Sequence, residues 1–442
     1  MWAQNRKIKV TNKFPQITAK AKADKQLKFT SLVHHINEKS LWSAALELKA
    51  DKATGIDNIS VPEYLSNGSA NISELVGKLK AKTYRSKPVR RVYIPKPGKD
   101  EKRGLGIPAT EDKVVQLCAK HLLEAIYEPD FLDCSHGFRP NRSCHTAIDR
   151  LDKVVMTKPI NFIVEVDVRK FFDNLSHYWL LRCLEERTSD PSYLWLIKQF
   201  LKAGVMENGV YAHSDQGSPQ GGIISPLLAN IYLHYVLDLW FEKKYKTSSG
   251  NYMELIRYCD DFVVLFESQK DAKRFLEELR ERLAKFGLEV AEDKTRLLEF
   301  GRNAYNRSQR TGIKADSFNF LGFTHYCKSS RNGKFIMGHK TSKDNLKRKL
   351  CELKNYVKAM RTVPLGMWMP TLKRKLSGHY NYFGISGNYR CIYQYYKQVI
   401  SITFKWLNRR SQRKSFNWLE FRNYLQGNPL PPPRIMVNLY KF

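Results

Sequence analysis

Hydrophobic residues recur at regular intervals along most of the chain, and their spacing predicts alternating helices and strands. Asn71 or Ser73 is a candidate N-cap near the start of one predicted helix. The long apolar segment at 227–245 directly follows a Gly- and Pro-rich loop and is expected to form one long helix. Further helices are predicted at 31–50, 70–85, 111–127, 177–203 and 270–287.

Two segments have the pattern of a β-hairpin. The first has arms at 89–95 and 103–108, which are joined by the turn sequence PGKDE. The second, 255–266, is a hydrophobic run interrupted by Asp260 and Asp261, so we expect a two-residue acidic tip between two strands. Further strands are expected at 161–168 and, as strand, turn and strand, at 288–301.

The charge of the chain is distributed unevenly. Its 442 residues include 75 Lys and Arg and 43 Asp and Glu, a formal net charge of +32. The central residues 160–300 hold 18 basic and 22 acidic residues, whereas 328–442 hold 24 basic and 3 acidic ones. Residues 1–50 hold 10 basic and 3 acidic ones. We therefore expect the chemistry in the nearly neutral middle and a polyanion, nucleic acid above all, on the basic arms.

Composition argues against several other classes of protein. The longest apolar stretch, 227–241, is interrupted by polar residues and falls short of the ~20 apolar residues that a membrane span needs. The N-terminus lacks the apolar region of a secretory signal. The eight cysteines form no C-x-x-C pair, which argues against a zinc module and a disulfide framework. No membrane partner and a reducing, cytoplasmic setting are expected. From Tyr326 the chain is basic and aromatic-rich and is expected to be helical up to a PLPPPR segment, which cannot be helix.

Three carboxylates are the strongest candidates for chemistry. Asp167 ends the predicted strand at 161–168, and Asp260 and Asp261 are adjacent in the second hairpin. Carboxylates between apolar strands are costly to bury without a compensating cation. Mg²⁺ suits such a site because it prefers carboxylate and carbonyl oxygens and leaves positions open for substrate phosphates. The adjacent pair alone equally suits an acidic turn exposed to water.

The chain order of these features resembles that of reverse transcriptases: a strand-ending Asp, a Gly- and Pro-rich loop before a helix, and an acidic hairpin. The finer resemblance is to the reverse transcriptases encoded by group II introns, and it extends over nearly the whole chain. Each block is modest alone, but eight blocks in the same order are highly specific. The resembling blocks are GIDN (55–58), VRRVYIPKPGKDEKRGLGIP (89–108), YEPDFLDCSHGFRPNRSCHTA (127–147), VDVRKFFDN (166–174), QGSPQGGIISPLLANIYLHYVLD (216–238), RYCDDFVV (257–264), FGLEVAEDKTRLLEFG (286–301) and FNFLGFTHY (318–326).

This resemblance implies a polymerase site that holds two Mg²⁺ ions. Asp167, Asp260 and Asp261 would be the catalytic residues and metal ligands, and the backbone carbonyl of Val168 would be a further ligand. Two ions ~3.5–4 Å apart can activate a primer 3′-hydroxyl and stabilise the leaving pyrophosphate. Cys259 stands where the family usually has Ala, a mild departure that suits packing under primer or template. We do not expect it to act as a nucleophile.

The resemblance also implies that four side chains, in addition to Val168, bind the nucleotide. Phe172 resembles the aromatic gate that excludes a ribose 2′-hydroxyl, although a Phe is by default a core residue. Gln220 resembles the residue that supports the incoming nucleotide. Lys96 and Arg103, on opposite arms of the first hairpin, would reach the triphosphate. Without the resemblance, both would be ordinary exposed charges.

The basic C-terminal third also holds 18 aromatic residues within 328–442. Exposed aromatic rings can stack on bases while cations neutralise phosphates, but rings at helical spacing can equally form a core. Residues 372–388 resemble the thumb, or maturase, domain of the family, which holds the template–primer and binds intron RNA. The candidate RNA-binding residues are Arg374, Lys375, Arg409, Arg410, Arg413 and Lys414.

The resemblance implies an α+β right-hand polymerase fold, in which fingers and a palm with an antiparallel sheet precede an α-helical thumb. The chain stops soon after PPPRI and has no Cys cluster there, so we expect a family member without an HNH endonuclease domain. The expected domains are a basic N-terminal extension (1–60), fingers (61–160), palm (161–326) and thumb or maturase domain (327–442).

The expected function is that of an RNA-directed DNA polymerase of a group II intron, which also binds the intron RNA as a maturase in splicing and retrotransposition. Its expected partners are the intron RNA, an RNA template with a DNA primer, target DNA and deoxynucleoside triphosphates. Two alternatives stay open: a host-domesticated reverse transcriptase for defence or repair, and a protein that is chiefly an RNA-binding splicing factor.

Overall fold

The computed structural model describes residues 13–95, 102–207, 209–213, 216–217, 221–247 and 250–440. These residues form two compact units, which we call unit 1 and unit 2. Unit 1 consists of the described residues of Met1–Pro95, Glu101–Ala147 and Val164–Leu297, and unit 2 of those of Ile148–Ile163 and Leu298–Phe442.

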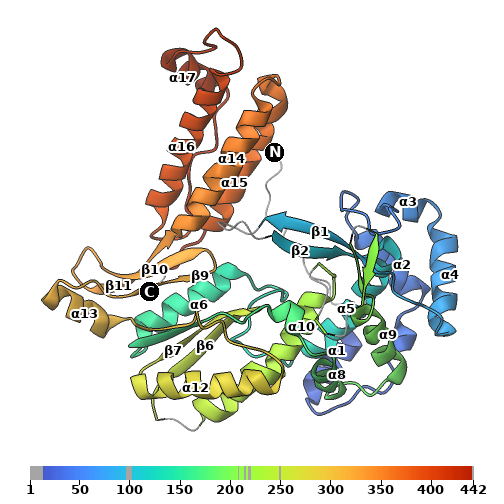
Figure 1. Ribbon diagram of the computed structural model, residues 1–442. Coiled ribbons are helices and arrows are strands. Elements are labelled where there is room, and N and C mark those ends of the chain that lie inside the picture. The colour runs from blue at the N-terminus through green and yellow to red at the C-terminus, as the bar shows by residue number, and fades with distance from the viewer. Residues whose placement is uncertain are drawn as a thin grey trace. The chain divides into compact units, whose positions relative to one another are not determined.

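Unit 1 combines many helices with two sheets (Figure 1). A helical stretch with two π-helical segments runs through α10 (Ser225–Leu233), η2 (His234–Asp238), α11 (Leu239–Phe241) and η3 (Glu242–Lys246). The other helices are α1 (Pro15–Ala23), the 3₁₀ turn η1 (Val33–His35), α2 (Glu38–Glu47), α3 (Val61–Ser66), α4 (Gly68–Lys80), α5 (Thr110–Tyr127), α7 (Phe171–Asn174), α8 (His177–Glu185), α9 (Pro191–Leu201) and α12 (Gln269–Lys285). The helix α6 (Cys144–Thr157) begins in unit 1 and ends in unit 2.

One sheet of unit 1 contains the predicted first hairpin. β1 (Val89–Pro95) and β2 (Lys102–Ile107) pair antiparallel, and β4 (Val205–Glu207) and β5 (Val210–Ala212) extend the sheet in the order β2-β1-β4-β5. The hairpin prediction is therefore confirmed for its two arms. The turn PGKDE lies outside the described residues.

The second sheet carries the candidate carboxylates and lies mainly in unit 1. Its order is β6-β7-β3-β8, and α12 packs along β7 (Figure 1). β6 and β7 pair antiparallel, as the second predicted hairpin requires. The strands are β3 (Phe162–Val166), β6 (Met253–Tyr258), β7 (Asp261–Phe266) and β8 (Arg296–Glu299).

The core of unit 1 is built around α5, whose residues are buried along most of its length and on which α1 and α2 pack. The predictions for α5 and α12 are confirmed. The predicted helix at 177–203 is instead two helices, because the Asp190 carboxylate accepts the backbone N–H groups of Ser192 and Tyr193 and Pro191 opens α9. The prediction of Asn71 or Ser73 as an N-cap was wrong. α4 begins earlier, and Asn71 inside it donates its side-chain amide to the Tyr64 carbonyl.

Unit 2 contains a small sheet and a group of long helices. Its sheet has the order β11-β10-β9, with strands β9 (Ser317–Phe320), β10 (Phe323–Ser329) and β11 (Phe335–Thr341). The expectation of helix directly after Tyr326 was wrong: the chain forms strands up to Thr341, because β10 and β11 pair antiparallel along their full lengths as a hairpin. The helices are α13 (Arg302–Thr311), α14 (Lys343–Met360), α15 (Leu365–Phe383), α16 (Tyr389–Leu407) and α17 (Trp418–Gly427).

Buried aromatic and aliphatic side chains of α14, α15 and α16 hold unit 2 together, with Trp368 and Leu372 among the most buried. α17 ends before the PLPPPR segment, which is not helical, as predicted. Within the described residues, no helix combines the length and the apolar character that crossing a membrane requires. Unit 2 combines the C-terminal residues from Leu298 onward with Ile148–Ile163, which include part of α6. The domain boundaries expected from the sequence stay a prediction.

Candidate active site

The hairpin of β6 and β7 places the two adjacent aspartates differently from the prediction. Tyr258 pairs with Asp261, so the two-residue turn consists of Cys259 and Asp260, and Asp261 is already the first residue of β7. The predicted acidic tip of Asp260 and Asp261 was therefore wrong by one residue. Cys259 takes the first turn position with φ of +59°, as the tight turns of β-hairpins demand.

The Cys259 side chain is buried, and burial raises the pKa of its thiol, with the Asp260 charge acting in the same direction. A thiol kept protonated in this way is a poor nucleophile. Cys259 thus packs beneath the turn, consistent with the expectation that it is not a nucleophile. Asp260 is partly exposed and Asp261 is exposed, so both can be reached from solvent.

Asp167 follows β3 directly, and its backbone is fixed by residues 289–291. The Ala291 N–H donates to the Asp167 carbonyl at 2.8 Å, and the Arg169 N–H donates to the Glu289 carbonyl at 2.8 Å. Val168 and Val290 face each other in this bridge, so the Val168 carbonyl points away from the 289–291 segment. That direction is the side of β3 on which β7 lies, because β3 stands between β7 and β8 in the sheet.

Lys294, which was not among the residues predicted from the sequence, contacts the candidate metal ligand Asp167. Lys294 Nζ lies 2.5 Å from Asp167 Oδ2, and both side chains are partly exposed. The hydrogen bond to Asp167 raises the pKa of the Lys294 ammonium, and the charge of Asp261 adds to the effect. Asp167 directly follows β3 and Asp261 is the first residue of β7, so the two carboxylates belong to neighbouring strands of the sheet. The sequence could have indicated Lys294 through the strand, turn and strand predicted at 288–301. If these strands pair beside the strand that ends at Asp167, the turn residues 292–295 come next to that carboxylate.

The donor set fits a hard divalent cation, since carboxylate oxygens and a peptide carbonyl are what such ions bind. Among the described residues, no group of three or more His, Cys, Asp and Glu side chains is already gathered in the geometry of a metal centre. The ammonium of Lys294 supplies the compensating positive charge beside Asp167. The site thus has suitable ligands on two adjacent strands.

The segment after Asp167 carries the predicted nucleotide gate. Phe172 is partly exposed, and its ring meets the buried ring of Phe171 edge to face at 5.3 Å between centroids. Gly217 lies against this segment: its N–H donates to the Leu175 carbonyl, and a Cβ on Gly217 would stand 2.9 Å from the Phe172 carbonyl oxygen. The loop that contains Gly217 is therefore in contact with the gate segment, and its backbone, with φ of +84°, favours Gly.

Of the remaining nucleotide-binding candidates, the structure describes only the backbone of Arg103. Lys96 and Gln220 lie outside the described residues. Arg103 belongs to β2, where its backbone pairs with Ile94. These three assignments stay predictions.

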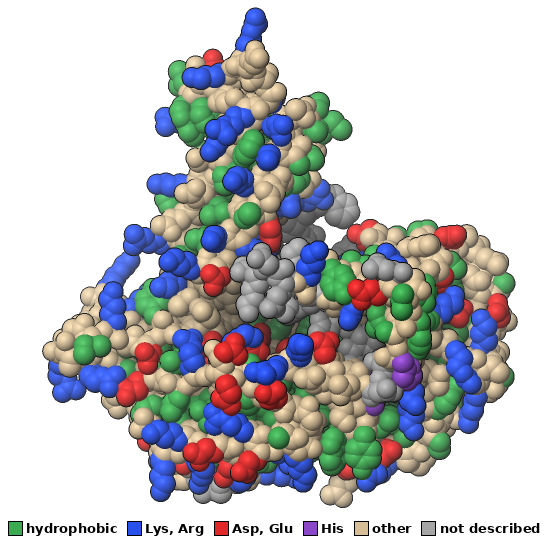
Figure 2. Space-filling model, viewed as in Figure 1, with side chains coloured by type: hydrophobic (Ala, Val, Ile, Leu, Met, Phe, Trp, Pro, Cys, Tyr) green, Lys and Arg blue, Asp and Glu red, His purple; other side chains and the backbone are tan. Residues whose placement is uncertain are grey.

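The candidate RNA-binding residues lie on unit 2. Arg374 and Lys375 are exposed on α15, and Lys375 Nζ stands 4.9 Å from the centre of the Tyr356 ring. The other four follow α16, and all but the partly buried Arg410 are exposed: Arg409, Arg410, Arg413 and Lys414. Figure 2 shows Lys and Arg side chains spread over the α14–α17 helices with few Asp and Glu between them.

Comparison with known proteins identifies the class of molecule. The reverse transcriptase (RNA-dependent DNA polymerase) family matches residues 94–325, more than half of the chain. The chain belongs to this family, and members of the family generally depend on divalent metal ions. The predicted fold class is confirmed in its α+β character, its antiparallel β6–β7 hairpin and its helical C-terminal region.

The relatives include proteins encoded by group II introns. The chain is 39% identical over 216 residues to the group II intron-encoded protein LtrA of Lactococcus lactis subsp. cremoris, which covers 48% of this chain and 36% of LtrA. It is 34% identical over 210 residues to a putative COX1/OXI3 intron 2 protein of Saccharomyces cerevisiae, covering 46% of this chain and 23% of that one. It is 29% identical over 349 residues to the protein YkfC of Escherichia coli, covering 71% and 87%. The chain thus spans little more than a third of LtrA.

A telomerase structure from Candida albicans, solved with a fragment of telomeric RNA, also resembles the chain, with a TM-score of 0.44 and 13% identity over 83% of this chain and 66% of the telomerase chain.

Proposed function

We propose that this protein is an RNA-directed DNA polymerase that adds deoxynucleotides to a DNA primer on an RNA template. Membership of the reverse transcriptase family, together with the position of Asp167 and Asp261 on neighbouring strands of one sheet, supports this proposal. In the reaction, the primer 3′-hydroxyl attacks the α-phosphate of a deoxynucleoside triphosphate, and pyrophosphate leaves.

Two Mg²⁺ ions would be held by Asp167, Asp260, Asp261 and the Val168 carbonyl. When bound, such ions supply the charge that activates the 3′-hydroxyl and stabilises the leaving pyrophosphate. The carboxylates would hold these ions in place, Asp260 from the turn and Asp167 from the end of β3. Before metal binds, the contact with Lys294 offsets the negative charge of Asp167.

Nucleotide selection would depend on the segment after Asp167. The partly exposed Phe172 ring would clash with a ribose 2′-hydroxyl and so favour deoxynucleotides. Gln220 would support the incoming nucleotide, and Lys96 and Arg103 would bind its triphosphate.

Unit 2 would bind group II intron RNA, template–primer and target DNA, so that the protein also acts as a maturase in splicing and retrotransposition. Its surface supports this proposal on α16. Tyr389 and Tyr393 are exposed and stack with their ring centroids 6.1 Å apart, and Lys397 Nζ lies 4.7 Å above the Tyr393 ring. Exposed rings beside a cation are the elements that bind unpaired bases and phosphates.

The test is primer extension on matched RNA and DNA templates, together with binding of the co-purified RNA. Replacing Asp260 and Asp261 with Ala should abolish DNA synthesis and leave RNA binding unchanged. The exposed Asp51 serves as a control, since Asp51→Ala should keep full synthesis. Synthesis that survives the double substitution would overturn the assignment of the site.

A further inference from the structure

We propose that Arg257 is a positioning residue that fixes the Cys259–Asp260 turn and thereby sets where the Asp260 carboxylate meets the divalent metal. This inference rests on the proposed function, because it concerns how the same site is assembled. Arg257 lies on β6, two residues before the turn, and is fully buried. It does not reach the reacting atoms itself but acts through the turn.

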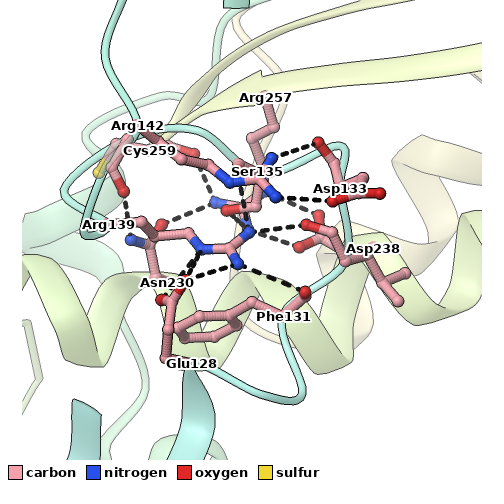
Figure 3. A network of polar contacts seen from close by, with 12 residues as sticks. Glu128, Phe131, Asp133, Ser135, Arg139, Arg142, Asn230, Asp238, Arg257 and Cys259 are labelled. Carbon is pink, nitrogen blue, oxygen red and sulfur yellow. Dashed lines mark hydrogen bonds and ion pairs between the residues drawn. The ribbon is translucent and has the colours of Figure 1, made fainter. Parts of the chain in front are cut away.

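The guanidinium of Arg257 is anchored on one side by a fork-like ion pair (Figure 3). Its Nε donates to Asp238 Oδ1 at 2.7 Å and its Nη2 to Asp238 Oδ2 at 2.5 Å. Both side chains are completely excluded from solvent. The bidentate contact fixes the plane of the guanidinium and hence the direction of its remaining N–H groups.

Those remaining N–H groups point at the turn and at its neighbours. Nη1 donates to the Cys259 carbonyl at 3.0 Å and to Asn230 Oδ1 at 2.9 Å, and Nη2 donates to Ser135 Oγ at 2.9 Å. The Cys259 carbonyl belongs to the peptide that joins Cys259 to Asp260. Because a non-glycine residue disfavours the positive φ of Cys259, this hydrogen bond holds the turn in a conformation that it would otherwise leave easily.

The turn is also confined from the other side by Gly137. Asn230 Nδ2 donates to the Gly137 carbonyl at 2.7 Å, and a Cβ on Gly137 would stand 2.6 Å from the Cys259 backbone nitrogen. The Arg257 backbone adds two bonds to the same segment, with the Cys134 carbonyl and the His136 N–H. Arg257 and Asn230 therefore clamp the Cys259 peptide against residues 134–137.

The π-helical segment η2 places Asn230 and Asp238 on the same side of their helical stretch, where both contact Arg257. Asn230 and Asp238 are eight residues apart, which in a regular α-helix leaves them about 80° out of phase. The wider η2 turn between them takes up about one extra residue and restores the phase, so that both side chains contact Arg257. A buried ion pair is a poor source of stability compared with apolar packing. Its geometric role at the turn accounts for its presence.

The chain offers a matched control in Arg139, whose side chain is also buried. Arg139 pairs with Glu128 and donates to the carbonyls of Leu132 and Ser135, but it makes no contact with the turn (Figure 3). Arg257→Lys keeps the charge beside Asp238 and loses the fork that reaches the Cys259 carbonyl. Arg139→Lys loses a comparable fork, one that holds the carbonyls of Leu132 and Ser135 but makes no hydrogen bond to Cys259 or Asp260 among the described residues.

The experiment measures Mn²⁺ binding by electron paramagnetic resonance on the full chain without nucleic acid, the Mg²⁺ dependence of primer extension, and thermal unfolding. We expect Arg257→Lys to weaken Mn²⁺ binding about fivefold or more, to raise the Mg²⁺ concentration at half-maximal rate similarly, and to lower kcat while KM for the nucleotide stays within about twofold. Arg139→Lys should lower the unfolding temperature by a similar amount with unchanged Mn²⁺ binding.

A second variant keeps the test decisive if Arg257→Lys does not fold. Asn230→Asp retains the Arg257–Asp238 pair and loses the donor to Gly137, so it should shift Mn²⁺ binding in the same direction by a smaller factor. The inference is overturned if folded Arg257→Lys or Asn230→Asp binds Mn²⁺ like the parent, or if Arg139→Lys weakens binding equally. Absence of DNA synthesis by the parent chain would instead overturn the proposed function, while Mn²⁺ binding would still judge the clamp.

Discussion

Units 1 and 2 differ in how their charged side chains are arranged. In unit 1, two buried arginines form ion pairs: Arg257 with Asp238 and Arg139 with Glu128. In unit 2, residues 328–442 hold 24 basic and 3 acidic residues, so most of the charge has no internal counterpart. Paired charges inside a fold fix geometry, whereas a one-signed surface attracts a polyanion. The comparison supports our proposal that unit 1 positions groups for chemistry and that unit 2 binds nucleic acid.

In unit 2, burial favours the neutral forms of a group of titratable side chains. His325 and His339 are fully buried with their Nδ1 atoms 3.0 Å apart, and His339 Nε2 lies 2.9 Å from Asp152 Oδ1. If His325 Nε2–H donates to the Phe320 carbonyl, His339 Nδ1–H donates to His325, and the Asp152 carboxyl must donate to His339. The pKa values agree with this direction: burial raises the pKa of Asp152 to about 7 and lowers that of His339 to about 4.

The largest effect should come from removing a catalytic carboxylate of unit 1. Asp167→Asn keeps the size of the side chain but removes the charge that would hold metal, so kcat for primer extension should fall by roughly a thousandfold or more. RNA affinity should stay within about twofold, because the proposed RNA surface lies on unit 2. Single-turnover primer extension and filter binding measure the two quantities. A parallel loss of both would contradict the division between the units.

A smaller effect is expected from reversing charge on unit 2. Arg409→Glu with Arg410→Glu should weaken RNA binding by roughly 10- to 100-fold at low salt. The slope of log affinity against log salt should fall by at least about 1.4, because each phosphate contact on a single strand contributes about 0.7. Reversal of the exposed Lys270 and Lys273 of α12, in the nearly neutral middle of the chain, is the control in unit 1. A loss no greater than that caused by Asp260→Ala would mean that this basic segment is not the RNA platform.

Acid should destabilise unit 2 through His379 by a moderate amount. This residue is buried against the Tyr395 ring, and neither ring nitrogen has a hydrogen-bond partner among the described residues. Burial, with a contribution from Lys349, lowers the pKa of His379 to about 4, so its stabilising effect is present above pH 6.5 and is lost as the pH falls toward 4. Between pH 6.5 and 5 the expected loss is roughly 2 kcal/mol.

His379→Phe should therefore raise the unfolding temperature at pH 5 by several degrees more than at pH 7. Hydrogen exchange of unit 2 peptides at both pH values assigns the change to this unit. His339 and Asp152 contribute little to this difference, because the lowered pKa of one and the raised pKa of the other oppose each other. An equal effect of His379→Phe at both pH values would show that His379 does not titrate in this range.

The smallest effect on primer extension is expected from removing the Cys259 thiol. Cys259→Ala should leave the rate of primer extension within about threefold, because the buried thiol has a raised pKa and packs only beneath the turn. Cys351, which is exposed on α14, serves as the comparison from unit 2. Alkylation with N-ethylmaleimide, followed by mass spectrometry, should modify Cys351 rapidly and Cys259 only on unfolding. Fast alkylation of Cys259 would contradict the buried turn.

Local patterns in the sequence predicted much of the fold. The spacing of apolar residues predicted α5, α12 and the arms of both hairpins, because the apolar residues of each element follow the period of a helix or form a short strand-like run. The errors arose where a neighbouring segment decides the outcome. Asp190 divides the segment at 177–203 by capping α9, and the register of β6 and β7 moves Asp261 out of the turn.

The amino-acid sequence by itself determined the family, the order of the candidate residues and the concentration of positive charge in the last third, since these are properties of composition and of linear order. Only the tertiary structure decided which residues meet. The contact of Lys294 with Asp167 and the clamp of Arg257 on Cys259 join segments 127 residues and two residues apart in the chain. Hydrogen bonds and close packing depend on distances in space, and neither the register of a hairpin nor the phase of a π-helical turn is visible in the pattern of hydrophobic positions.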